Sequence, residues 1–179
     1  MKGYKSPNLS LRDWQKRRET FSAYDGYIWY GVDAENNVAE FQASNTYVPE
    51  LFFQNAARNK YLMDFFDNLP EITTGRIPEN LREEIKPSPD NMPRWAKESN
   101  RGLYIFKDPE DLYWYQSIYF EKFKGTNFPY ELQSVPERAL KFGELQKNVR
   151  ELLEPCRFEN LNFADCQFLD VSEYFYCEE

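Results

Sequence analysis

The chain has 179 residues, of which 41% are hydrophobic and 29% are charged, and its formal net charge is -8. This length suits one domain, and the balance of apolar and charged residues excludes a membrane-embedded protein and a disordered one. Histidine is absent, which excludes Ser-His-Asp and Cys-His catalytic arrangements and most zinc sites. The acidic balance also disfavours nucleic acid as a partner.

The excess negative charge lies near the carboxy terminus. From Glu151 to Glu179 there are eight acidic residues and one basic residue, Arg157, whereas the preceding 150 residues carry 22 acidic and 21 basic residues. Such a stretch is either a solvated face or a surface that attracts a basic partner. The sequence leaves both interpretations open.

The first predicted elements are a helix and a β-hairpin. Apolar residues at helical spacing predict a short amphipathic helix over Ser10–Phe21. Two runs rich in aromatic and β-branched residues, Tyr24–Val32 and Val38–Ala43, predict the hairpin, and Asn36 and Asn37 are suited to the positive φ of its turn. Both faces of the first strand carry aromatic rings, so we expect each face to be covered.

A long apolar stripe follows. Residues that recur every four positions, with apolar neighbours beside them, predict a core helix over Glu50–Asn68; the recurring residues are Phe53, Ala57, Tyr61 and Phe65. A short helix is expected at Pro78–Ile85. The proline-rich stretch 86–94 predicts an internal loop within a single domain spanning residues 1–179.

The second half predicts further strands and helices. Gly102–Lys107 has the composition of a buried strand, and the stretch from Asp108 to Phe123 favours a helix, with a strand at Tyr113–Phe120 as the alternative. The run Ser134–Glu137 has the residues of a helix start and predicts a last helix that ends near Pro155.

The end of the chain has two interpretations. Aromatic and polar residues alternate from Phe158 onward, which favours two short strands. Three blocks of five residues between Glu159 and Glu173 instead resemble the pentapeptide-repeat pattern, although so few blocks complete barely one turn of a solenoid. Taken together, the elements predict the α+β class, with an antiparallel sheet and helices packed mainly on one face.

No strong signal for cofactor chemistry is present. The chain has 7 glycines and no glycine-rich phosphate loop, so no cofactor is expected. The cysteines Cys156, Cys166 and Cys177 have neither metal-site nor disulfide-framework spacing, so no metal is expected. Because Met1–Asp13 has no apolar run of signal-peptide length, a reducing cytoplasm is the expected location.

Four short runs carry a family resemblance. Residues 27–33, 38–41, 48–49 and 101–106 resemble small uncharacterised bacterial proteins, some of them similar to immunity proteins of toxin systems. The resemblance implies a cytoplasmic α+β protein that works by binding another protein. It contains no catalytic signature, and it assigns no functional residue.

The expected function is therefore non-enzymatic protein binding, with an acidic and aromatic carboxy-terminal face that docks a basic protein. The resemblance suggests an immunity-type inhibitor as one form of this function. The expected contact residues on that face are Glu159, Asp165, Asp170, Glu173, Tyr174, Phe175 and Glu178.

The alternative function is a carbohydrate-binding module or a carboxylate-based hydrolase centred on the aromatic hairpin. Tyr27, Trp29 and Asp33 are its candidate ligand-binding residues. Asp25, Asp33 and Glu40 are the candidate acids, although turn or edge solvation is the role that we expect for them first.

Overall fold

A computed structural model describes part of the chain, namely residues 27–43, 48–49, 52, 55–81, 97–107, 129–171 and 174. The predictions for Ser10–Phe21, residues 86–94 and the stretch from Asp108 to Phe123 lie outside the described residues. Of the predicted helix Pro78–Ile85, only the first four residues are described. They form a turn in which the Leu81 amide donates to the Pro78 carbonyl over 3.1 Å.

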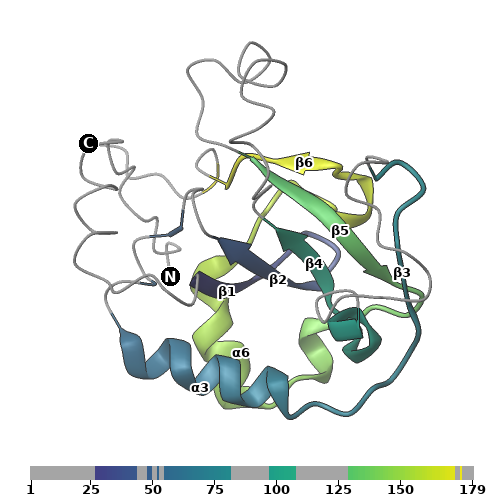
Figure 1. Cartoon of the computed structure of the whole chain (residues 1–179). Helices are drawn as coiled ribbons and strands as arrows, with labels where there is room; N and C mark the ends of the chain where they lie inside the picture. The colour runs from purple at the N-terminus through teal and green to yellow at the C-terminus, as the bar shows by residue number, and fades with distance from the viewer. Residues whose placement is uncertain are drawn as a thin grey trace.

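A mixed six-stranded sheet is the centre of the fold (Figure 1). Its strands are β1 (Tyr27–Val32), β2 (Val38–Ala43), β3 (Gly75–Arg76), β4 (Tyr104–Lys107), β5 (Tyr130–Pro136) and β6 (Phe168–Leu169). The order is β1-β2-β4-β5-β3, and β6 also pairs with β5. The α+β class is thus confirmed.

The expected antiparallel sheet is found only in part, because β2 and β4 pair in parallel. Between these two strands the chain passes through a helix on one side of the sheet. A crossover of this kind brings the next strand in with the same direction, whereas a tight turn would reverse it. The other strand pairs are antiparallel.

The hairpin prediction is confirmed for β1 and β2, which pair in register from Tyr27 opposite Ala43 to Val32 opposite Val38. In the turn, the Asn36 amide donates to the carbonyl of Asp33 over 3.1 Å. Asn36 has a φ of 63° and is the one non-glycine residue with positive φ among those that the structure describes. Asparagine tolerates this left-handed conformation better than most residues.

The helices α3 (Ala56–Asp67) and α6 (Lys147–Leu153) lie on the same side of the sheet (Figure 1). Four short 3-10 helices accompany them in the described residues: η3 (Ser99–Arg101), η4 (Phe142–Glu144), η5 (Glu154–Cys156) and η6 (Phe163–Asp165). The side chain of Asn55 accepts a hydrogen bond from the Arg58 amide and so caps the start of α3.

The buried side of α3 is formed by the apolar neighbours within the predicted stripe more than by the residues that recur every four positions. Leu62 and Phe66 are buried, whereas Ala57 is exposed and Tyr61 is 41% exposed. Arg58 lies on the same helix face as Leu62 and Phe66, and its guanidinium donates to the Leu152 carbonyl from Nε over 3.1 Å and from Nη2 over 2.6 Å. The helix therefore presents to α6 the side that carries Arg58.

The predicted helix start at Ser134–Glu137 is wrong, because Ser134, Val135 and Pro136 belong to β5. Pairing explains the outcome: β5 is hydrogen-bonded to β4, β3 and β6. Ser134 uses its hydroxyl within this arrangement, 2.7 Å from the hydroxyl of Ser99. Contacts on both edges of the strand outweigh a local helix-start pattern.

Two apolar cores lie on opposite faces of the sheet. The helix-side core includes Tyr30, Val32, Val38, Leu62, Phe66, Leu103, Ile105, Val149 and Leu153. The outer core is more aromatic and includes Trp29, Phe41, Tyr104, Phe106, Tyr130, Leu132, Phe158, Phe163, Leu169 and Val171. Both faces of the hairpin are thus covered, as the pattern of β1 predicts.

The chain after α6 covers the outer face. The amide of Phe158 donates to the carbonyl of Val32 over 2.8 Å. The amide of Leu132 donates to the carbonyl of Gln167 over 2.9 Å. Of the two strands expected here, β6 is present, and Arg157 forms an isolated bridge with Val32. The five-residue blocks do not repeat one conformation, because a turn, η6 and β6 succeed one another along residues 159–169.

We predict that Gly31→Ala destabilises the fold, because a Cβ at Gly31 would lie 2.7 Å from a ring carbon of Phe158 and 3.2 Å from the carbonyl oxygen of Cys156. The expected loss is about 1–3 kcal/mol in the free energy of unfolding, measured by urea denaturation. Gly143→Ala is the matched control, since nothing lies within 4 Å of its Cβ position. Equal midpoints for the two variants would contradict the close packing at Gly31.

Candidate functional site

The acidic surface that the sequence predicts begins at η5 and lies on the part of the chain that covers the outer core. Residues 154–170, here called the acidic segment, carry four carboxylates and one cation. Glu159 and Asp165 are exposed, and Asp170 is partly buried. Neither Glu159 nor Asp165 forms an ion pair with any described residue, so their charges face solvent without a cation.

The single cation of the acidic segment is already engaged. Arg157 Nε lies 3.5 Å from a carboxylate oxygen of Glu154, and its Nη2 donates to Oδ1 of Asn36 over 2.7 Å. The guanidinium also lies 4.6 Å from the centre of the Phe142 ring. These contacts direct Arg157 toward the hairpin turn and η4, so it does not neutralise Glu159 or Asp165.

Buried side chains anchor the acidic segment. Phe158 is 1% exposed and Phe163 is fully buried, and their ring centroids lie 5.4 Å apart at a steep angle. The Ala34 amide also donates to the carbonyl of Leu161 over 2.9 Å. The outward carboxylates therefore stand on backbone that is held at several points.

Asp33, a candidate ligand-binding residue, lies beneath the acidic segment with 1% of its surface exposed. One carboxylate oxygen accepts the Asn37 amide over 2.7 Å. The other accepts the Asn37 side-chain amide over 2.8 Å and the Phe163 backbone amide over 2.9 Å. Asp33 thus joins the hairpin turn to η6, and its oxygens are occupied by these donors.

Trp29 lies in the outer core and is 4% exposed. Its ring stacks on Phe41 with a centroid distance of 4.1 Å, and its Nε1 donates to the Tyr130 hydroxyl over 2.9 Å. This ring consequently presents no open face on which a sugar could stack. The backbone of Tyr27 pairs with Ala43, and its side chain lies outside the described part of the structure.

The remaining predicted contact residues are only partly described. Tyr174 is partly buried, and its ring centroid lies 5.2 Å from that of Phe158. Tyr174 therefore extends the outer core toward the surface. Glu173, Phe175 and Glu178 lie outside the described residues.

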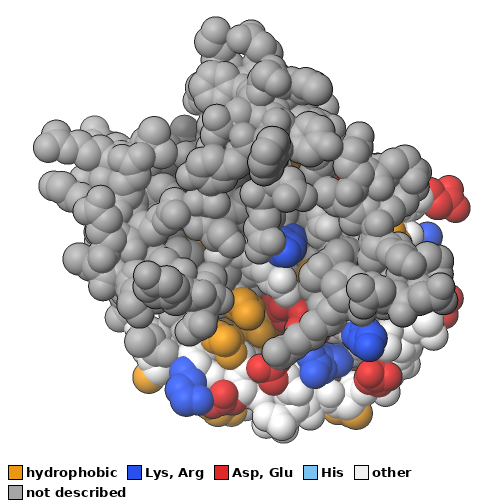
Figure 2. Space-filling view, in the orientation of Figure 1, with side chains coloured by type: hydrophobic (Ala, Val, Ile, Leu, Met, Phe, Trp, Pro, Cys, Tyr) orange, Lys and Arg blue, Asp and Glu red, His pale blue; other side chains and the backbone are white. Residues whose placement is uncertain are grey.

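The opposite side of the molecule has a different charge pattern. Figure 2 shows acidic and basic side chains interspersed over the described surface near α3, without a patch of one sign there. Within α3, Lys60 and Asp64 form an ion pair. In contrast to this pair, the exposed carboxylates of Glu159 and Asp165 in the acidic segment form no ion pair with any described residue.

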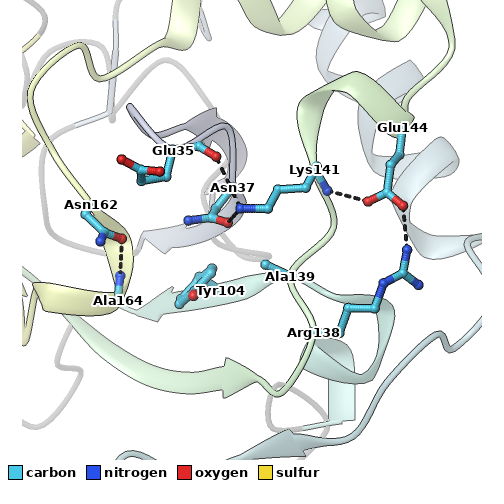
Figure 3. Close-up of a pocket in the computed structure, with 9 residues that line it drawn as sticks. All are labelled: Glu35, Asn37, Tyr104, Arg138, Ala139, Lys141, Glu144, Asn162 and Ala164. Carbon is cyan, nitrogen blue, oxygen red and sulfur yellow. Dashed lines mark hydrogen bonds and ion pairs between the residues drawn. The ribbon is translucent and has the colours of Figure 1, made fainter.

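An open pocket of about 560 Å³ adjoins the acidic segment (Figure 3). Its lining consists of Glu35, Asn37, Tyr104, Arg138, Ala139, Lys141, Glu144, Asn162 and Ala164. Lys141 Nζ reaches across the pocket and donates to Oδ1 of Asn37 over 2.7 Å. Arg138 pairs with Glu144.

Tyr104 lines the same pocket and is 8% exposed. Burial raises the pKa of its hydroxyl, and the nearby charges of Asp33 and Asp165 raise it further. Tyr104 is consequently a neutral group at physiological pH. On the other side of the pocket, Arg138 pairs with Glu144 and Lys141 bonds Asn37. The pocket is thus a polar surface beside the acidic segment.

A pair of buried carboxyl groups lies on the helix side of the sheet. Glu40 on β2 is 3% exposed, and Glu98, directly before η3, is 7% exposed. The side-chain nitrogen of Gln42 donates to both, over 2.7 Å to Glu40 and 2.9 Å to Glu98. Burial raises the pKa of Glu40 to about 8, and the negative field of Glu98 adds to the shift.

Sequence reasoning names Glu40 as a candidate acid but does not find its partner. Asp33, the other candidate acid that the structure describes, belongs to the hairpin turn and not to this pair. Glu98 follows a stretch without a recognisable motif, and only the tertiary structure brings it to Gln42. The one available signal is the period-two pattern, which places Tyr30 and Glu40 opposite each other on an inward face.

The described residues contain no cluster of three or more cysteine and carboxylate side chains that could hold a metal ion. Within the same part of the chain, no helix has the length and apolar character needed to cross a bilayer.

Comparison of the chain with protein-family models, with curated proteins and with solved structures found no match. The resemblance to immunity proteins of toxin systems therefore stays a prediction.

We predict that Asp33→Asn loosens the attachment of η6 to the hairpin turn. Three donors converge on the two oxygens of Asp33, and an amide in its place would set its own NH2 group against at least one of them. The expected cost is about 1–3 kcal/mol in the free energy of unfolding, measured by urea denaturation. The exposed neighbour variant Glu35→Gln should change it by less than about 0.5 kcal/mol, and a similarly small effect of Asp33→Asn would contradict this role.

Proposed function

We propose that this chain is a protein-binding protein that docks a basic protein through the acidic segment. The observation that carries the proposal is the contrast between its two sides: the carboxylates of Glu159 and Asp165 lack cation partners among the described residues, while the rings of Phe158 and Phe163 are buried beneath them. The immunity-type inhibitor suggested by the family resemblance is one form of this proposal.

Rigidity supports binding through this surface. Because the backbone of the acidic segment is hydrogen-bonded to β1, to β5 and to the hairpin turn, a partner would not have to order it. A surface that is already ordered loses less conformational entropy on association than a mobile one.

Charge supports the choice of partner. Unpaired carboxylates at the rim of an interface accelerate encounter with a positively charged protein, and buried apolar contacts then determine the lifetime of the complex. Tyr174, whose ring is partly buried against Phe158, is the described residue best placed to supply such a contact.

The carbohydrate-binding and hydrolase alternatives have less support. Trp29 and Asp33 are both in the interior, so neither offers a ligand an open surface. Glu40 and Glu98 form a carboxyl pair, but each is at least nine-tenths buried, and neither lines the pocket that adjoins the acidic segment. A carboxylate hydrolase needs its acids in contact with substrate and water.

We predict that the double reversal Glu159→Lys with Asp165→Lys weakens binding of the basic partner by about tenfold at low salt, because it replaces attraction with repulsion at the rim. The partner would first be identified by affinity capture with the wild-type chain and then purified. Its dissociation constant would be measured by calorimetry at several salt concentrations, and the difference between the two chains should shrink as ionic strength rises.

The matched control is the double reversal Glu71→Lys with Glu137→Lys, which makes the same change in net charge at two exposed positions outside the acidic segment. Circular dichroism would verify that all three proteins are folded. If both double variants weaken binding equally, the effect is due to net charge alone and not to the position of the carboxylates. Unchanged binding by the acidic-segment variant would overturn the proposal.

A further inference from the structure

The carboxyl pair of Glu40 and Glu98 has a geometry that requires a proton. One donor nitrogen, that of Gln42, lies within hydrogen-bond distance of an oxygen from each carboxyl group. Two ionised carboxylates so close together and so deeply buried would repel each other strongly, so one of them retains a proton at neutral pH. Because the two groups interact, this proton belongs to the pair and not to a single oxygen.

The groups around the pair act in both directions. Asp67 at the end of α3 adds a negative field that favours the proton, whereas the hydrogen bond from Gln42 favours the ionised form of Glu40. Tyr30 on β1 is also hydrogen-bonded to Glu40. Arg101 on η3 lies 3.9 Å from the carboxylate of Asp67 and partly offsets it. On the other side, Lys107 of β4 lies beside Gln42 in register, and it faces Glu131 on β5.

We propose that the Glu40–Glu98 pair is a proton-dependent latch that holds residues 97–102 against the sheet and opens more readily as the shared proton is lost. This proposal is independent of the protein-binding function. Residues 97–102 are called the junction segment below.

The junction segment connects several parts of the fold. Its Ser99 hydroxyl lies 2.7 Å from that of Ser134 on β5. The backbone carbonyl of Asn100 accepts the amides of Ile72 and Thr73 over 2.8 and 3.1 Å, and its side chain accepts the amide of Gly75 over 2.7 Å. Release of Glu98 from the sheet would therefore weaken the hydrogen bonds that Asn100 accepts from residues 72–75.

Gly102 closes the junction segment in a conformation that only glycine readily adopts. Its φ is 86°, and a Cβ there would lie 2.7 Å from the backbone nitrogen of Leu140. The backbone amide of Leu140 donates to the carbonyl of Gly102 over 2.8 Å. The segment is thus fixed at its carboxy end, and Glu98 is the contact that fixes its other end to β2.

The direction of the pH effect follows from the raised pKa of Glu40, about 8 in the closed state against 4.5 for a solvated glutamate. The closed state therefore binds a proton that the open state has lost between these two values. Closing is most favourable below about pH 4.5, and its equilibrium constant falls about tenfold per pH unit up to about pH 8. Above that value the dependence levels off.

The first experiment is a carbon-13 NMR titration of the glutamate side-chain carboxyl groups in the wild-type chain. We expect one glutamate to titrate near pH 8, and we expect this transition to disappear in Glu40→Gln and to move to lower pH in Glu98→Gln. Titration of every glutamate below about pH 6 would overturn the proposal. This measurement on the wild type does not depend on whether a variant folds.

The second experiment follows hydrogen exchange at the amides of Ile72, Thr73 and Gly75 between pH 5 and 9, corrected for intrinsic exchange rates. Their protection factors should fall about tenfold per pH unit up to about pH 8 in the wild type. In Glu40→Gln they should stay level, because the new amide keeps a donor toward Glu98 and cannot ionise. Parallel profiles in the two proteins would overturn the latch.

Two controls separate the latch from general effects of alkaline pH. The variant Glu35→Gln changes an exposed carboxylate on the same hairpin and should retain the wild-type pH dependence. The Arg150 amide, which bonds the Gln146 carbonyl in α6, should show the same protection profile in all the proteins. If Arg150 follows Ile72 in the wild type, the opening is global and a local latch is contradicted.

Discussion

The structure depends on the aromatic stack that the outer face of the sheet presents and that the chain after α6 covers. Phe41 lies at its centre, within 6 Å of the ring centroids of Trp29, Phe106, Tyr130 and Phe163. Closely packed rings bury a large area with little loss of side-chain entropy. The polar chain that crosses them is held by backbone bonds to β1 and β5, which is why its carboxylates can remain in solvent.

The local elements could be predicted from sequence because their signals are short-range. Alternating β-branched and aromatic residues mark β1, β2 and β4, and a stripe of apolar residues marks α3. The strand β5 is different, since the residues Ser134 to Glu137 have the chemistry of a helix start and only pairing with distant strands makes them extended. The parallel pairing of β2 with β4 has the same origin, because no local pattern encodes the direction in which a later strand returns.

The candidate sites also differ in whether a local sequence signal marks them or only the tertiary structure brings their residues together. Charge composition alone indicates the acidic segment, whereas nothing local shows that Asp33 lies beneath it. The Glu40–Glu98 pair joins residues that are 58 positions apart, and Gln42 bridges them only after β2 and the junction segment have come together. A buried carboxyl pair also contradicts the simple expectation that the hairpin acids are solvated. Sequence reasoning finds exposed charge more readily than it finds charge that the fold has enclosed.

The position of the outer-face cover in the chain has a consequence for biosynthesis. The ribosome makes β1, β2 and β4 well before it makes Phe158 and Phe163, so a nascent chain exposes the ring of Phe41 until synthesis has passed the acidic segment. During this interval the incomplete protein exposes a hydrophobic aromatic surface of the kind that chaperones bind. Premature termination just after β5 would make that exposure permanent, and such fragments should aggregate in the cell.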